Sequence, residues 1–138
     1  MQNNFDYNVR SPQKEQKNMS ELIHRADTYI AQRASMVDAR FRHTYHAMPP
    51  VGWMNDPNGF CYAFGRYHVF FQFHPYDSVW GPMHWGHYAS DDLIRWEWQG
   101  TALAPDTAYD ADGCFSGSAI VKDGALYLMY TAVAGGKQ

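Results

Sequence analysis

The chain has 138 residues, 46% hydrophobic and 17% aromatic, which is enough for one modest domain with an apolar core. Its formal net charge is −3, and this balance argues against a nucleic-acid-binding protein, which normally carries a basic excess. Residues 46–138 hold nine of the 14 acidic residues and all five Trp. Such a segment favours a neutral polyol ligand, although packing inside a β-rich core is the more common use of aromatic side chains.

Targeting signals and a disulfide framework are both absent from the sequence. The first 18 residues contain no apolar stretch typical of a signal peptide, and no apolar run is long enough to span a membrane. The sequence therefore predicts a cytoplasmic protein with no membrane partner, if Met1 is the true start. Cys61 and Cys114 lie far apart and form no C-x-x-C motif, so we expect two free, buried thiols.

The N-terminal third divides into a tail and a helix. Residues 1–19 are polar, which predicts a disordered tail. Apolar residues then recur at three- and four-residue steps over about Glu21–Ala39, the pattern of an amphipathic helix, with Ser20 as its N-cap. Residues 20–45 are thus interpreted as helix and linker. We expect the helix to pack on its own domain, and binding of a partner is the alternative.

From residue 46 onward the pattern is that of β-strands. Five Pro and Gly residues within 49–59 exclude a helix and predict a tight loop. Two hairpins and two further strands follow, at Phe60–Phe64, Tyr67–Phe73, His84–Ala89, Arg95–Gln99, Ser116–Val121 and Ala125–Thr131. This all-β pattern fits a sandwich or a propeller. Propeller blades have about 40–50 residues, so residues 46–138 supply about two. Two blades leave open edges, and we therefore expect a fragment of a longer protein.

The segment Trp53–Gly59, with the sequence WMNDPNG, is the strongest chemical signal. It places the carboxylate of Asp56 beside the carboxamide of Asn55. Pro57 fixes its own backbone φ, and Gly59 tolerates a positive φ, so the turn is expected to be rigid. A rigidly held carboxylate suits a nucleophile. The alternative is an ordinary Asx-turn, because the same residues are turn formers.

Four ordered sequence blocks resemble glycoside hydrolase family 32. They are His46–Pro50 with Trp53–Gly59, then Phe70–Pro75, then Trp80–Leu93 with Trp96, and finally Gly113–Ala119. The resemblance implies the N-terminal part of an all-β, five-bladed β-propeller over residues 46–138, preceded here by the N-terminal α-helix. It also implies hydrolysis of terminal non-reducing β-D-fructofuranosides, such as sucrose or sucrose 6-phosphate, with retention through a covalent fructosyl intermediate.

The same resemblance implies roles for individual residues. Asp56 would be the nucleophile that attacks the anomeric carbon. The substrate-binding residues would be Trp53, Met54, Asn55, Gln72, Trp80, Phe115 and Ser116. The implied partner is a small sugar, namely sucrose, sucrose 6-phosphate or a fructan, with no cofactor, and the oligomeric state is left open.

Two segments of the family pattern do not occur in this sequence. One is Arg-Asp-Pro, whose Asp holds fructose hydroxyls, and the other is Glu-Cys, whose Glu is the acid/base. Both are expected after residue 138, so we expect the chain alone to be inactive unless Asp110 or Asp112 supplies the proton. A fructosyltransferase of the same fold, a non-catalytic sugar-binding module and an inert truncated product are the alternatives. The helix before the first block favours the intracellular sucrose-6-phosphate hydrolases.

No metal site is predicted. His84 and His87 are three residues apart, and in a strand this spacing places them on opposite faces. The acidic cluster of Asp106, Asp110 and Asp112 does not have the spacing of an EF-hand loop.

Overall fold

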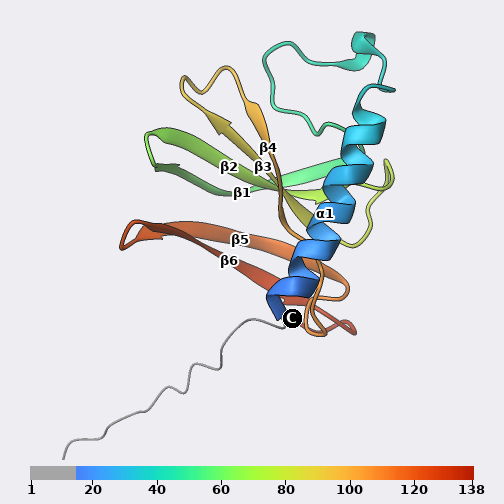
Figure 1. The fold of residues 1–138 in the computed structure, drawn as a ribbon, viewed down its shortest axis with the longest axis vertical. Coiled ribbons are helices and arrows are strands. Elements are labelled where there is room, and N and C mark those ends of the chain that lie inside the picture. The colour runs from blue at the N-terminus through green and yellow to red at the C-terminus, as the bar shows by residue number, and fades with distance from the viewer. Residues whose placement is uncertain (1–14) are drawn as a thin grey trace, which may run out of the picture.

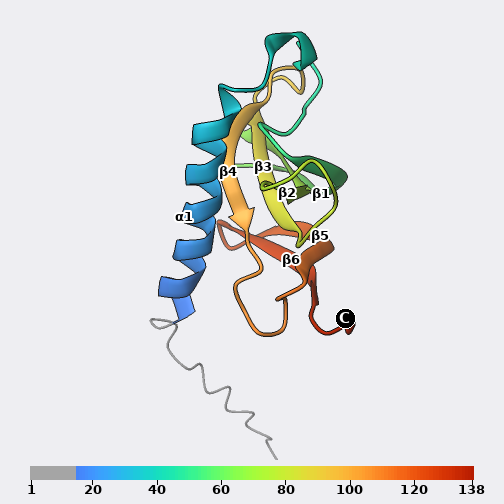
Figure 2. The same ribbon diagram turned by 90° about the vertical axis from the view of Figure 1, so that its right-hand side faces the viewer.

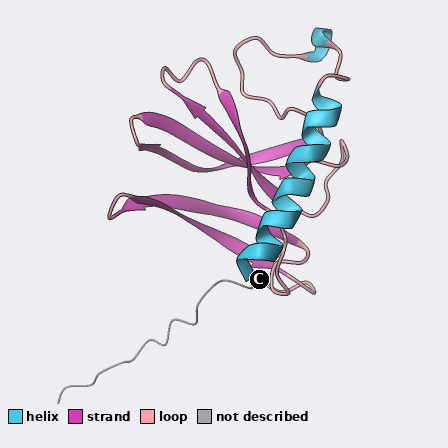
Figure 3. Cartoon of the chain, in the orientation of Figure 1, coloured by secondary structure: helices cyan, strands magenta, loops and turns pink. Residues whose placement is uncertain are grey.

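The computed structural model describes residues 15–138, and side chains from residue 21 onward (Figures 1 and 3). It contains the helix α1 (Glu15–Ala34), the 3-10 turn η1 (Ala39–Phe41) and six strands: β1 (Trp53–Ala63), β2 (Arg66–His74), β3 (His84–Ser90), β4 (Glu97–Leu103), β5 (Gly113–Lys122) and β6 (Ala125–Val133). All six predicted strands are therefore present, with shifted ends. The described part of the chain has no helix with the length and apolar character needed to cross a bilayer.

The strands form two antiparallel sheets. One has the order β1-β2-β3-β4, and the other is the β5–β6 hairpin, which lies next to β1 (Figure 1). The start of β4 was predicted at Arg95 and lies at Glu97. The reason is a turn in which Asp92 Oδ1 accepts hydrogen bonds from the backbone N–H groups of Ile94 (2.9 Å) and Arg95 (2.7 Å). These bonds compete with strand pairing and delay it.

The bounds of the helix correct the prediction. Helix α1 spans Glu15–Ala34 instead of about 21–39, so Ser20 lies inside the helix and does not cap it. The later residues leave the helix because the Asp38 side chain accepts a hydrogen bond from Arg40 N at 2.9 Å and begins η1. Residues 15–19 of the predicted tail belong to the helix, and the rest of that tail lies outside the described residues.

Helix α1 packs on its own domain, along the outer strand β4 (Figure 2). Ala26 and Ile30 are buried in this contact. Between them, Asp27 Oδ1 accepts hydrogen bonds from the backbone N–H (2.9 Å) and the hydroxyl (2.8 Å) of Thr101 in β4. The helix thus covers a strand edge that would otherwise be open to pairing with another chain.

Two apolar clusters form the core, and β2 contributes to both. Phe71 packs with Ile30 and Tyr88 in a cluster that faces α1. Its neighbour Phe70 packs with Trp85 in a cluster that faces β5 and β6. Successive side chains in a strand point to opposite faces, so the apolar run in β2 is buried on both sides.

The two cysteines differ in burial. Both are free, as expected, but only Cys114 is buried, whereas Cys61 is half-buried near the β1–β2 turn. Burial raises the pKa of both thiols. Neither thiol therefore has the electropositive surroundings typical of a reactive cysteine.

Two histidines of β3 make the stability of the fold dependent on pH. Burial lowers the pKa of His84 to about 4, and burial together with the nearby His68 and Arg66 lowers the pKa of His87 to about 4. The unfolded chain, with ordinary histidine pKa values, therefore binds more protons between about pH 4 and pH 6.5. We expect the free energy of unfolding to fall as the pH is lowered through this range, on the order of 1–2 kcal/mol at pH 5 for the well-buried His84.

Urea unfolding at pH 7.5 and pH 5 measures this effect. The variants His84→Gln and His87→Gln should each show a smaller difference between the two pH values than the unmodified protein. Equal stability of the unmodified protein at both pH values would contradict the prediction.

Candidate active site

The segment Trp53–Gly59 is the first half of a strand and not the tight loop that the sequence predicted. A register shift in the β1–β2 pairing lies between Met54 and Pro57, so that Asn55 and Asp56 together oppose the single residue Gln72. In a regular strand these two neighbours would point to opposite faces. The β-bulge lets Asn55 bond to Gln72 while Asp56 bonds to Ser116, and such re-aiming of side chains is a common use of bulges next to active sites.

A second bulge lies across the sheet boundary, in β5. The β5–β6 register shifts between Phe115 and Gly117, which leaves Ser116 without a cross-strand partner. Gly117 is required here because a Cβ atom would collide with the backbone oxygen of Met129. The bulge directs the hydroxyl of Ser116 toward β1.

A chain of hydrogen bonds joins four of the residues that the sequence singled out. Asn55 Nδ2 donates to Gln72 Oε1 at 2.8 Å, and Gln72 Nε2 donates to Ser116 Oγ at 2.9 Å. Ser116 Oγ then donates to Asp56 Oδ2 at 3.2 Å. Gln72 is only 4% exposed, whereas Asp56 is exposed. The chain holds one oxygen of an accessible carboxylate, and the other oxygen has no hydrogen-bond partner among residues 15–138.

Asn58 completes this arrangement and was missed in the sequence. It is 4% exposed, its Oδ1 accepts a hydrogen bond from Gly117 N at 3.1 Å, and its Nδ2 donates to the backbone oxygen of Asp56 at 3.4 Å. Asn58 thus ties β1 to the bulge of β5. The sequence signal that could have indicated Asn58 as a site residue is its position directly after the proline in the N-D-P-N-G segment.

Two buried polar atoms in the start of β1 have no hydrogen-bond partner among residues 15–138. They are Asn55 Oδ1, an acceptor, and Trp53 Nε1, a donor. Buried polar groups are normally paired. Both atoms are closed to solvent, so a ligand can reach them only after a side-chain movement.

The remaining predicted residues fall into two places. Trp80, in the loop between β2 and β3, is 56% exposed and lies edge-to-face with Phe115 of β5, with ring centroids 6.2 Å apart. Met54 is half-buried and packs against the core cluster of Phe71 and Phe73. The structure therefore brings Trp80 and Phe115 together next to Ser116 and places Met54 at the margin of the core.

The two carboxyl groups considered as substitute acids have structural partners. Asp110 is fully buried and accepts hydrogen bonds at 2.7 Å from Thr107 N, Thr107 Oγ1 and the hydroxyl of Tyr130. Asp112 Oδ2 accepts from Gly135 N at 2.6 Å. Asp110 is not accessible to a substrate, so its suggested role as an acid is wrong. Within the described part of the chain, no group of three or more His, Cys, Asp and Glu side chains is arranged to hold a metal ion.

Comparison with known proteins identifies the family. Residues 46–138 match the family model described as the glycosyl hydrolases family 32 N-terminal domain. The Escherichia coli raffinose invertase is 59% identical over 87 residues, covering 63% of this chain and 18% of the invertase. The Escherichia coli sucrose-6-phosphate hydrolase is 49% identical over 109 residues, covering 79% of this chain and 23% of the hydrolase.

Solved structures give the same result. A Bombyx mori GH32 β-fructofuranosidase has a TM-score of 0.72 and 51% identity, covering 79% of this chain and 23% of that protein. The sucrose-6-phosphate hydrolase from Lactobacillus gasseri has a TM-score of 0.70 and 40% identity, covering 76% of this chain and 22% of that protein.

The two sheets thus have the architecture of the first blades of a five-bladed β-propeller, which confirms the predicted fold class. The chain belongs to glycoside hydrolase family 32. It spans about a fifth of the length of the curated relatives that it matches.

Proposed function

We propose that the complete protein encoded at this locus hydrolyses terminal non-reducing β-D-fructofuranosides, with sucrose or sucrose 6-phosphate as substrate. The observation that carries this proposal is the hydrogen-bond chain from Asn55 through Gln72 and Ser116 to the exposed carboxylate of Asp56. The names of the relatives support it. A variant of the Bombyx mori enzyme has also been solved in complex with sucrose, at 52% identity to this chain.

In the proposed mechanism, Asp56 is the nucleophile of a retaining glycosidase. Its free oxygen attacks the anomeric carbon of fructose and forms a covalent ester, while the leaving oxygen receives a proton from a second carboxyl group. Water then hydrolyses the ester with the help of that same group, and the carboxyl groups of such a pair lie about 5–5.5 Å apart. The family resemblance assigns the second carboxyl to the Glu of the Glu-Cys segment, which this sequence does not contain.

The other residues around Asp56 bind and orient the sugar in this proposal. Asn55 and Trp53 contact the sugar in this proposal, as the family resemblance implies. Trp80 and Phe115 present apolar ring surfaces to the C–H faces of the substrate. Ser116 and Gln72 fix the carboxylate so that little motion is needed before attack.

The experiment is an assay of the complete protein with sucrose and sucrose 6-phosphate. We expect release of fructose, with the β-anomer formed first when the products are followed by NMR. Formation of fructosyl-oligosaccharides in place of free fructose would indicate a transferase. Absence of any product, with sugar binding retained, would indicate a binding module. The expected cytoplasmic location is a further proposal, tested by fractionation of cells that express the complete protein.

We also propose that neither Arg66 nor Arg95 binds the phosphate group of sucrose 6-phosphate. Arg66 is held by Asp91 at 2.7 Å and by Glu97 at 2.8 Å, and Arg95 is held by Asp92 at 3.1 Å. Both lie at the β3–β4 end of the first sheet. We therefore expect Arg66→Ala and Arg95→Ala to leave the ratio of kcat/KM for the two substrates unchanged, within about twofold. A collapse of that ratio in either variant would show the prediction to be wrong.

A further inference from the structure

The position of Trp80 is not fixed by its own contacts. Its side chain is 56% exposed, and its aromatic neighbour is Phe115. The indole therefore stays where the backbone of the β2–β3 loop (residues 75–83) places it. What holds this loop then decides how the ring is presented to a sugar.

The loop is held from outside the sheet by α1. The rings of Tyr29 in α1 and Tyr76 in the loop meet edge-to-face with centroids 5.1 Å apart, and the Tyr29 hydroxyl donates to the backbone oxygen of Tyr76 at 3.2 Å. Two guanidinium groups of the same helix extend the stack, Arg25 at 5.8 Å from the Tyr76 ring and Arg33 at 5.3 Å from the Tyr29 ring. This aromatic ladder, Arg25–Tyr76–Tyr29–Arg33, joins the helix to the loop.

A second contact transmits this restraint along the loop to Trp80. His74, at the end of β2, donates a hydrogen bond from Nδ1 to the backbone oxygen of Val79 at 3.0 Å. Gly81 lies directly against the His74 ring, where a Cβ atom would not fit. The residues on both sides of Trp80 are thus tied to the strand end, and Tyr76 is tied to the helix. The loop is also supported from the sheet, because the Tyr76 ring lies edge-to-face with the rings of His74 (6.0 Å) and His84 (5.7 Å).

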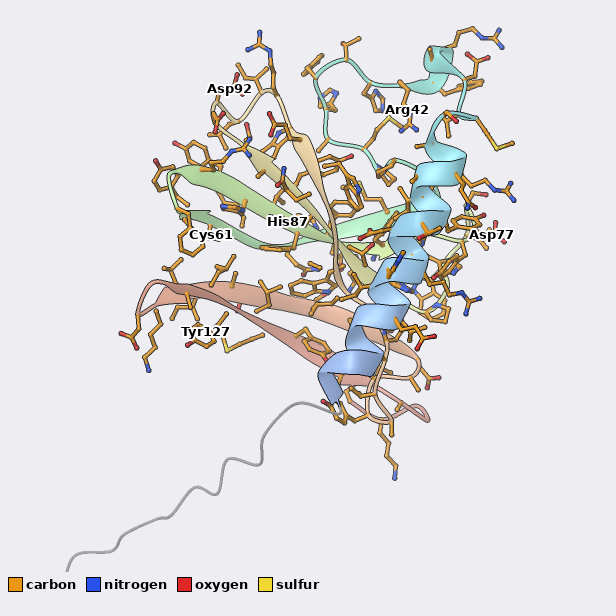
Figure 4. The ribbon with its side chains drawn as sticks, in the orientation of Figure 1. Arg42, Cys61, Asp77, His87, Asp92 and Tyr127 are labelled. Atoms are coloured by element: carbon orange, nitrogen blue, oxygen red, sulfur yellow. The ribbon has the colours of Figure 1, made fainter. Side chains whose placement is uncertain are left out.

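The space beside the ladder is open enough for the loop to move. A cavity of about 300 Å³ lies between α1 and the loop, and its walls include Arg33, Val37, Pro75 and Asp77. Asp77 marks this side of the loop, next to the helix (Figure 4). Loss of the Tyr29 ring would enlarge this space and remove the contact that holds the Tyr76 ring from the side of the helix.

We propose that Tyr29 and Tyr76 are positioning residues that set the affinity for the sugar through Trp80. Helix α1 therefore has a role in substrate binding although it lies outside the strands that carry the site. This proposal rests on the proposed function for its effect on KM. The contact between helix and loop is independent of that function and can be measured separately.

The experiment compares Tyr29→Ala and Tyr76→Ala with the conservative variants Tyr29→Phe and Tyr76→Phe in the complete protein. Hydrogen exchange of the peptide that covers residues 75–83 reports on the loop. Steady-state kinetics with sucrose reports KM and kcat separately. Leu128→Ala is the stability control, because Leu128 packs against the other core cluster, between the two sheets.

We expect both alanine variants to speed exchange in residues 75–83 and to raise KM about tenfold, or about 1.4 kcal/mol, with kcat nearly unchanged. Tyr76→Phe keeps the ring and the backbone acceptor, so its exchange rate in residues 75–83 and its KM should equal those of the unmodified protein. Leu128→Ala should change neither the exchange rate in residues 75–83 nor KM. In a Trp80→Ala background, Tyr29→Ala should have no further effect on KM, since it acts through that ring.

Other outcomes separate the two proposals. Unchanged exchange in residues 75–83 would overturn the role of the ladder, whatever the activity. Faster exchange with unchanged KM would overturn the link to substrate binding. A complete protein without activity would refute the proposed function and with it the effect on KM, and hydrogen exchange would still decide whether the helix holds the loop.

Discussion

Replacement of Asp56 by Asn is expected to reduce kcat of the complete protein at least about 10³-fold, or about 4 kcal/mol. The carboxamide has nearly the same size and can still accept the hydrogen bond from Ser116 Oγ. It cannot form the covalent ester, because a neutral amide oxygen is a poor nucleophile. Sugar binding should persist, because the aromatic side chains proposed to contact the sugar, Trp80 and Phe115, remain in place.

Steady-state kinetics and isothermal titration with sucrose measure both parts of this prediction. The matched control is Asp91→Asn, the same change at an exposed residue whose partner is Arg66. This control should retain normal kcat and KM. If Asp56→Asn loses less than about tenfold in kcat, Asp56 is not the nucleophile.

Replacement of Trp85 by Ala is expected to lower the free energy of unfolding by about 3–5 kcal/mol. Trp85 is fully buried between the two sheets, where it packs with Phe70 and Tyr130. Its Nε1 donates to the backbone oxygens of Cys114 and Phe115, both at 3.2 Å. The change therefore leaves a cavity and removes the donor for two carbonyls next to Ser116. Activity should fall as well, because the bulge of β5 loses its support.

The comparison variant is Trp80→Ala, which removes the same side chain from a site that is 56% exposed. Its free energy of unfolding should stay within about 0.5 kcal/mol of the unmodified protein. Urea unfolding followed by circular dichroism measures both variants. Similar stability of the two would contradict the burial of Trp85.

Much of the fold follows from local patterns. The strands β2, β3, β5 and β6 were predicted from apolar runs between turn residues, and the hairpins from Gly65 and Gly124. The C-terminal end of α1 and the start of β4 were predicted wrongly because side-chain hydrogen bonds decide them. Asp38 and Asp92 each accept hydrogen bonds from nearby backbone N–H groups. These bonds compete with the hydrogen bonds of a helix or strand, and the periodicity of apolar residues gives little sign of such competition.

Some residues of the candidate site were predicted from the sequence and others were not. Asp56, Asn55, Gln72 and Ser116 were singled out through ordered blocks that resemble a family, and they meet in the structure. Met54 was also singled out, and it is half-buried and packs against the core cluster just before the bulge in β1. Asn58 was missed, since its partner Gly117 is 59 residues away in the sequence.

The sequence by itself determined the presence of the six strands, because these depend on residue types at short spacing. Its four ordered blocks, through their resemblance to a family, also indicated the family and the candidate nucleophile. The tertiary structure alone decided how those residues meet. Register shifts at Asn55–Asp56 and at Ser116 turn these side chains toward one another, whereas the regular alternation of a β-strand would place neighbouring side chains on opposite faces. No local sequence pattern encodes these register shifts. The contact of Tyr29 with Tyr76 is of the same kind. It joins residues 47 apart, and only the packing of α1 on the finished sheet brings them together.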